Sequence, residues 1–139
     1  MSAAAMITGE CFCGEVKYRI DKDLVDARSC HCSRCRKVSG AQGSAYALVQ
    51  PGSFKWLSGE ELLTAYTGEH GFGLRFCSRC GSTLCGEFKG EVHGVMLGCL
   101  NGNPEITFAR HIFTDSKAHW DTLPDDGVPQ YPEAAPEPS

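Results

Sequence analysis

The 139-residue sequence has no long hydrophobic run. No segment approaches the roughly 20 apolar residues that a membrane-spanning helix requires, so we expect no membrane association. The first residues, MSAAAMITGE, also lack the basic start and the apolar core of about 7–15 residues that mark an export signal. These absences predict a cytoplasmic protein.

An excess of positive charge is missing as well. The formal net charge is −4, and it resides entirely in residues 124–139, because acidic and basic side chains balance over residues 1–123. Surfaces that bind nucleic acids are usually strongly basic. We therefore expect no nucleic-acid partner.

The sequence also has no long amphipathic helical pattern. Short alternating or apolar segments, separated by turn residues, predict strands instead. These segments are 16–20, 44–49, 54–57, 62–66, 74–76, 83–88 and 92–100. Only residues 114–122 have the composition of a short helical turn. The pattern predicts an all-β fold of short antiparallel strands.

A chain of this length has room for one hydrophobic core. We place the domain at residues 6–123, after an N-terminal extension of residues 1–5. Residues 124–139 contain five of the seven prolines and all of the net negative charge. This composition predicts an acidic, proline-rich tail that is partly disordered.

Cysteine is abundant, with nine residues in the chain. An odd number cannot pair completely into disulfides within one chain, and a reducing compartment disfavours disulfides in any case. The cysteines are therefore expected to be metal ligands, catalytic groups or buried free thiols.

Two short cysteine pairs are spaced as ligands of a single zinc ion. Cys11 and Cys13 form one pair, and Cys77 and Cys80 form the other, followed by Gly81. Two pairs of thiolates from separate turns make a closed, tetrahedral structural zinc site. The alternative for the second pair is a redox dithiol, but that motif usually accompanies a βαβ pattern, which this sequence lacks.

A third group, Cys30, Cys32 and Cys35, offers three thiols within six residues. Three protein ligands leave a fourth position for water or substrate, as in catalytic zinc sites. The alternative is a second closed site with a fourth protein ligand. The candidates for that ligand are His31, Cys85 and Cys99.

The three candidate fourth ligands have other expected roles. Because His31 lies between two ligands, an extended backbone would point its side chain away from theirs. We therefore expect His31 to contact the ligand residues rather than the metal ion. Cys85 and Cys99 lie in apolar segments, where cysteine behaves as a small buried hydrophobe. We expect both in the core.

Three motifs in chain order resemble the glutathione-dependent formaldehyde-activating enzyme family, whose domain is shared with centromere protein V. The motifs are GECFCG at 9–14, CHCSRCR at 30–36 and FCSRCGS at 76–82. The resemblance implies a zinc-binding β-tent fold with two zinc ions per chain. It assigns the structural zinc to Cys11, Cys13, Cys77 and Cys80. It assigns the active-site zinc to Cys30, Cys32 and Cys35.

The family's activity is the addition of glutathione to formaldehyde. The resemblance therefore implies a zinc-dependent carbon–sulfur lyase that acts on a thiol adduct of a small aldehyde. Its partners would be a small-molecule thiol, such as glutathione, and a small electrophile. Two alternatives remain open: a zinc-stabilised, non-catalytic binding module of the centromere protein V type, and a redox-sensing thiol protein.

Overall fold

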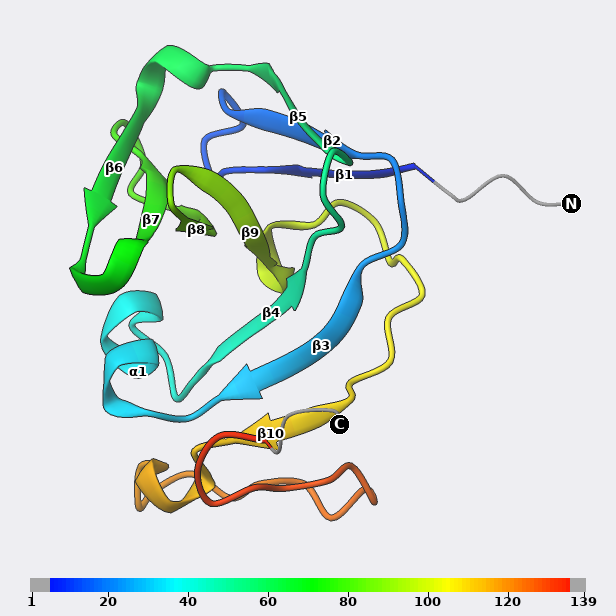
Figure 1. Cartoon of the computed structure of the whole chain (residues 1–139), viewed down its shortest axis with the longest axis vertical. Coiled ribbons are helices and arrows are strands. Elements are labelled where there is room, and N and C mark those ends of the chain that lie inside the picture. Colours follow the sequence, from blue (N-terminus) through cyan, green and yellow to red (C-terminus); the bar gives the residue numbers. More distant parts are fainter. Residues whose placement is uncertain (1–5, 136–139) are drawn as a thin grey trace, which may run out of the picture. The chain divides into compact units, whose positions relative to one another are not determined.

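The computed structural model describes residues 6–135 (Figure 1). The expected extension at residues 1–5 and the end of the expected tail, residues 136–139, lie outside the described residues. Within residues 6–135 the structure is mostly short strands, with one α-helix. This confirms the expectation of a predominantly β fold.

The elements follow one another in many short segments. The strands are β1 (Ile7–Glu10), β2 (Lys17–Ile20), β3 (Val25–Cys30), β4 (Ser44–Leu48), β5 (Phe54–Ser58), β6 (Leu63–Thr67), β7 (Phe72–Cys77), β8 (Thr83–Phe88), β9 (Glu91–Met96) and β10 (Arg110–Ile112). Helix α1 spans Ser33–Ser39. Short 3₁₀ turns cover Glu60–Leu62, Glu69–Gly71, Leu97–Cys99 and Thr114–Ser116.

The described residues pack into two compact units, each made of separate chain segments. The first unit comprises residues 6–25 and 47–105. In it, β1, β2 and β5 form a three-stranded antiparallel sheet, and β9, β8, β7 and β6 pair in that order as antiparallel neighbours. The β8–β9 hairpin turns through Lys89 and Gly90, both with positive φ, as a tight two-residue hairpin requires.

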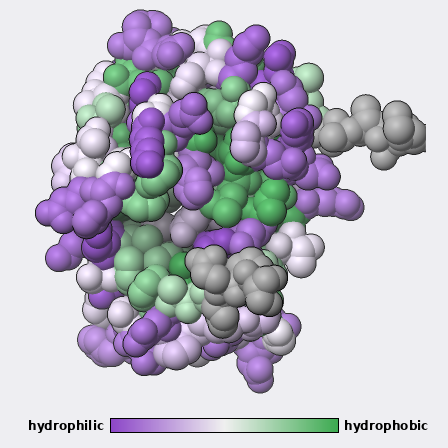
Figure 2. Space-filling view, in the orientation of Figure 1, coloured by the Kyte–Doolittle hydropathy of each residue, from purple (hydrophilic) through white to green (hydrophobic). Residues whose placement is uncertain are grey.

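The core of the first unit is built around Tyr18 of β2. Its ring is fully buried and stacks on Phe54 of β5 at a centroid distance of 5.0 Å. Gly9 of β1 leaves room for this ring, since a Cβ at that position would lie 2.2 Å from the ring carbon Cζ. Figure 2 shows hydrophobic side chains gathered at the surface over this unit, framed by hydrophilic ones.

The second unit comprises residues 26–46 and 106–135. Strand β10 lies parallel to β3, with Ile112 opposite Cys30. Residues 129–131 pair with β10 in the parallel direction, because the amide of His111 donates to the carbonyl of Pro129 and the amide of Tyr131 donates to the carbonyl of His111. The end of β3 is thereby fixed by neighbouring backbone.

The structure differs from the sequence prediction in its helical segments. The helical turn predicted over 114–122 is limited to Thr114–Ser116, and the α-helix lies at Ser33–Ser39 instead. The strand predicted over 92–100 ends at Met96, where a 3₁₀ turn begins. Among residues 6–135, no helix has the length and apolar character needed to cross a membrane.

Candidate metal centres

Four cysteine sulfurs converge in the first unit. The Sγ atoms of Cys11, Cys13, Cys77 and Cys80 all lie within 4.8 Å of one another. The sulfur of Cys13 is 3.5 Å from that of Cys11 and 3.9 Å from that of Cys77. A tetrahedral ion with metal–sulfur bonds of about 2.3 Å holds its sulfurs about 3.8 Å apart. The donor set therefore fits one tetrahedral metal ion.

The turn after β1 presents the first two thiols. The amide of Gly14 donates to the carbonyl of Cys11 at 3.0 Å, and Gly14 has a φ of 81°. The amide of Val16 donates to the sulfur of Cys11 at 3.3 Å. An amide hydrogen bond of this kind stabilises a thiolate.

The turn between β7 and β8 presents the other two thiols in a similar way. The amide of Gly81 donates to the carbonyl of Cys77 at 2.8 Å, and Gly81 has a φ of 83°. The hydroxyl oxygen of Ser82 lies 3.4 Å from the sulfur of Cys80 and accepts a 2.8 Å hydrogen bond from the amide of Phe12. Ser82 thus ties the two turns together. Sequence reasoning missed it, although it ends the motif FCSRCGS.

Three further sulfurs converge in the second unit, where Cys30, Cys32 and Cys35 form one group. Cys30 is the last residue of β3, and Cys32 is the N-cap of α1. The sulfur of Cys32 accepts a 3.3 Å hydrogen bond from the amide of Cys35, in the first turn of the helix. A strand end and a helix start therefore bring the three thiols together.

Two serine hydroxyls fix the carbonyl oxygen of Cys35. Ser39 Oγ donates to it at 2.9 Å, and Ser44 Oγ donates to it at 2.8 Å. Ser39 lies at the end of α1, and Ser44 begins β4. These contacts hold the cysteine turn against the next strand, and nothing in the cysteine spacing pointed to them.

The electrostatics of this group suit a cation. The hydrogen bond from the Cys35 thiol is the main cause that lowers the pKa of Cys30 to about 6. Burial opposes this shift, whereas the Cys32 amide and the charge of Arg28 add to it. The same contact raises the pKa of Cys35. Neighbouring thiolates repel one another, and a divalent cation bound between them would remove that repulsion.

Among residues 6–135, no fourth cysteine, histidine or carboxylate joins the three thiols in this group. His31, considered above as a fourth ligand, is buried with its ring against two other side chains. Its Nε2 lies 3.1 Å from Nδ1 of His111, and its Nδ1 lies 3.7 Å from a carboxylate oxygen of Asp121. The two ring nitrogens of His31 therefore face these groups.

The last two cysteines are placed as small apolar side chains. Cys85 is fully buried in the core, and Cys99 is half-buried against it. Burial raises the pKa of Cys85 to about 12 and that of Cys99 to about 11. Both thiols are thus protonated at neutral pH.

The described residues thus form a small, strand-rich protein with a four-cysteine and a three-cysteine cluster, each of which could hold a metal ion. Residues 6–116 match the model of the glutathione-dependent formaldehyde-activating enzyme family, and the chain belongs to that family.

Comparison with solved structures finds a protein from Rhodobacter sphaeroides, a structural genomics target whose crystal structure is similar to this chain. The two share 33% sequence identity with a TM-score of 0.54, and the match covers 70% of this chain and 91% of the other. No curated protein matches the sequence.

Proposed function

We propose that the chain is a zinc-dependent carbon–sulfur lyase that acts on the adduct of a thiol, such as glutathione, with a small aldehyde, such as formaldehyde. Family membership supports glutathione-linked formaldehyde activation in general terms. The proposal assigns one structural zinc to the four-cysteine cluster and one open zinc to the three-cysteine cluster. It also places the protein in a reducing compartment, the cytoplasm, where the thiols stay reduced.

The observation that carries the proposal is the convergence of Cys30, Cys32 and Cys35 without a fourth protein ligand among residues 6–135. Three ligands leave one coordination position for an exogenous group, whereas a purely structural site is closed by four. Zinc bound there would hold an incoming thiol and lower its pKa.

The side chains beside the cluster suggest where the aldehyde oxygen is received. Ser44 contacts the Cys35 carbonyl, and Tyr46 lies two residues further along β4, on the same face of that strand. The guanidinium of Arg28, which itself pairs with Asp26, lies 5.9 Å from the centre of the Tyr46 ring. Arg28 shares a face of β3 with Cys30, two residues later.

Tyr46 is suited to donate rather than to accept a proton. Burial raises its pKa to about 12, and the Cys30, Cys35 and Cys32 thiolates add to this while Arg28 opposes it. We assign its phenol the role of hydrogen-bond donor to the carbonyl oxygen of the aldehyde. Negative charge develops on that oxygen during addition, so a fixed donor there stabilises the transition state.

The reaction itself is balanced without a redox step. A carbon–sulfur bond forms between the thiol and the carbonyl carbon, the π electrons of the carbonyl move to oxygen, and the proton that leaves sulfur ends on that oxygen. The reverse direction breaks the carbon–sulfur bond and releases thiol and aldehyde. The protein's part is to hold the two reactants together and to donate the hydrogen bond.

The test compares wild type with Cys35→Ala in the full-length chain, with Cys99→Ala as a control that removes a thiol outside both clusters. We expect wild type to bind two zinc ions and to accelerate formation of S-hydroxymethylglutathione, followed by NMR. The Cys35→Ala variant should bind one zinc, stay folded and lose the acceleration, whereas the control should keep both zinc ions and the activity.

Zinc X-ray absorption separates this proposal from the non-catalytic binding module. Three sulfurs and one lighter ligand at one site, replaced by a fourth sulfur when glutathione is added, support the lyase. Four protein sulfurs at both sites, unchanged by glutathione, together with no acceleration by wild type, would contradict it.

A further inference from the structure

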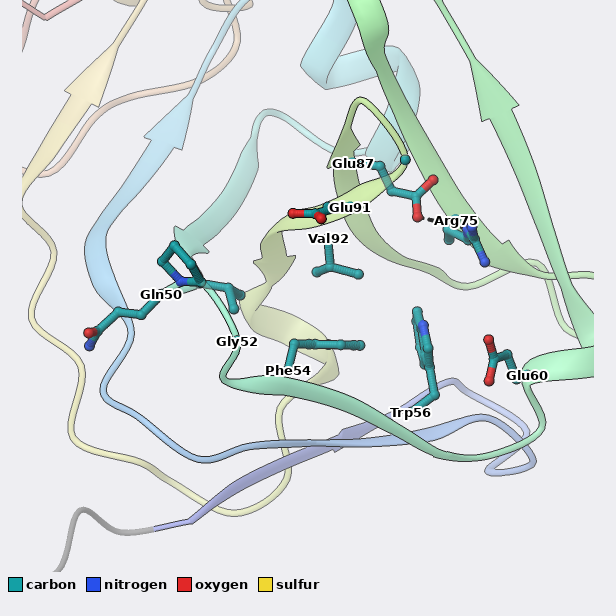
Figure 3. Close-up of a pocket in the computed structure, with 12 residues that line it drawn as sticks. Gln50, Gly52, Phe54, Trp56, Glu60, Arg75, Glu87, Glu91 and Val92 are labelled. Atoms are coloured by element: carbon teal, nitrogen blue, oxygen red, sulfur yellow. Dashed lines mark ion pairs between the residues drawn. The ribbon is translucent and has the colours of Figure 1, made fainter.

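A cavity of about 390 Å³ opens in the first unit, and none of its lining residues is a cysteine. The turn that leads into β5, the aromatic side chains of that strand, and the β8–β9 hairpin form its walls (Figure 3). This volume lies within the range of small-molecule sites in proteins. Its lining side chains combine two aromatic rings with three carboxylates and one guanidinium.

The aromatic wall is held in place from behind. Phe54 and Trp56, alternate residues of β5, line the cavity with their rings edge to face at a centroid distance of 4.7 Å. The buried ring of Tyr18 packs against both, at 5.0 Å from Phe54 and 5.9 Å from Trp56. The two lining rings are therefore fixed before any ligand binds, which lowers the entropic cost of binding.

The charge of the cavity is negative. Buried Glu87 forms an ion pair with Arg75 at 2.8 Å, and this pair leaves no net charge (Figure 3). Glu60 and Glu91 also line the cavity, and within residues 6–135 neither has a basic side chain within 4.0 Å. In Figure 3, Glu60 lies beside Trp56, and Glu91 lies on the opposite side of the cavity from the aromatic strand. Two carboxylates thus remain uncompensated around two aromatic rings.

These features discriminate between ligand classes. An anion would be repelled by the carboxylates, and glutathione carries a net negative charge. A neutral apolar molecule would gain contact with the rings but nothing from Glu60 or Glu91. A cation with apolar substituents gains from both, because its charge is attracted to the face of an aromatic ring and to the carboxylates.

We propose that this cavity, formed by Phe54, Trp56, Glu60 and Glu91, is a binding site for a small alkylated ammonium cation. The charge of the ligand would lie over the aromatic rings, between the two carboxylates. The inference does not depend on the cysteine clusters or on the lyase proposal, so either can fail while the other holds.

The test uses the tryptophan of the cavity as its own reporter. The chain has two tryptophans, and Trp120→Phe removes the other, which is 64% exposed. The zinc-loaded, full-length variant is titrated at constant ionic strength with choline and, separately, with 3,3-dimethylbutan-1-ol, which has carbon in place of the charged nitrogen. We expect a saturable change in Trp56 emission with choline and none with the neutral alcohol at the same concentrations.

Three charge-neutralising variants test whether the two unpaired carboxylates of the cavity contribute to choline binding. Glu91→Gln and Glu60→Gln should each weaken choline binding by about fivefold, as expected for loss of one partly exposed charge contact. Glu105→Gln, an exposed residue of the same unit outside the cavity, makes the same charge change and should leave binding unaltered. Circular dichroism and zinc content confirm that each variant is folded.

Several results would overturn the proposal. An equal response to choline and to the neutral alcohol would define an apolar pocket without cation preference. If Glu105→Gln weakened choline binding as much as Glu91→Gln does, the effect would come from the net charge of the protein and not from the cavity. No saturable response below about 50 mM choline, the weak limit for such a site, would mean that the cavity does not bind this class.

Discussion

Loss of the four-cysteine cluster should destabilise the fold about twice as much as loss of the three-cysteine cluster. The comparison is between Cys13→Ala and Cys35→Ala, each of which removes one ligand. Cys13 is exposed, so its replacement leaves no cavity and the effect reports on the metal link. Alanine offers no side-chain ligand of its own, so neither variant can rebuild the cluster.

The magnitudes follow from the length of chain that each cluster closes. Cys13 and Cys77 are 64 residues apart, whereas Cys30 and Cys35 are separated by five. The chain-entropy relation for a cross-link gives about 4 kcal/mol for the longer loop and about 2 kcal/mol for the shorter one at 25 °C. The free energy of unfolding of a typical protein is about 5–15 kcal/mol, so the larger loss would remove a large part of it.

The measurement is the free energy of unfolding from urea titrations, followed by circular dichroism, at the same free zinc concentration for every variant. Zinc content per chain is measured on the same samples. Cys99→Ala serves as the control, because it removes a half-buried thiol outside both clusters and reports the cost of lost packing alone. This packing cost is subtracted from the loss of Cys35→Ala, whose side chain is also partly buried, whereas the loss of exposed Cys13→Ala is read directly.

A loss for Cys35→Ala equal to or larger than that for Cys13→Ala would refute the reasoning. It would mean that the six-residue cluster, and not the link between distant turns, holds the fold. Unchanged stability of Cys13→Ala with one zinc missing would refute it too, because the four-cysteine cluster would then make no contribution to folding.

Three further predictions concern single side chains. Ser82→Ala removes the hydroxyl shared by the Phe12 amide and the Cys80 sulfur, and should lower zinc affinity at the four-cysteine cluster by about 10–100-fold in a chelator competition. Tyr46→Phe should reduce kcat for adduct formation by about 100-fold while both zinc ions stay bound. An unchanged kcat would mean that the Tyr46 phenol is not the hydrogen-bond donor to the aldehyde oxygen. Cys85 has a folded-state pKa of about 12, above its unfolded value, so unfolding releases its proton at alkaline pH. The contribution of Cys85 to stability should therefore be complete below about pH 9, and stability should fall by up to about 1.4 kcal/mol per pH unit above it. Urea midpoints measured between about pH 8 and 10.5 give this slope, which should be shallower in Cys85→Ala.

The grouping of the cysteines could be predicted because it depends on local chain geometry. Two thiols spaced by one or two residues on a turn point the same way, and this requirement is visible in the spacing around Cys11 and Cys77. The structure brings together the same sets of four and three that the spacing indicated. Cys85 was predictable for a different reason, since an isolated cysteine in an apolar strand has nothing to bind and is buried.

Helix α1 could not be read from hydrophobic periodicity, because none of its residues is buried. Its signals lie at its ends instead. Cys32 caps the N-terminus, Arg36 and Lys37 stand in the last turn, and Gly40 ends the helix in the left-handed conformation with a φ of 67°. Cysteine is an unusual N-cap, so the capping pattern was hidden by its apparent role as a ligand.

The cavity lining was not predictable for a topological reason. Its side chains come from residues 49–60, 75 and 87–92, which the strand pairing assembles. The sequence favours core or edge packing for Trp56 over a role in ligand binding, whereas in the structure its side chain lines the cavity. No sequence motif includes Glu60 or Glu91, and only their position around two aromatic rings gives them a common role.

The two clusters also differ in when they become complete as the chain is made. Synthesis runs from the N-terminus, and Cys80 follows Cys35 by 45 positions. At about 5–20 residues per second, the local cluster has all its thiols a few seconds before the four-cysteine cluster has its last one. A metal ion that meets the growing chain in that interval finds three thiols of one cluster and only two of the other. The order of the residues would therefore allow the three-cysteine cluster to bind a metal ion before the four-cysteine cluster is complete.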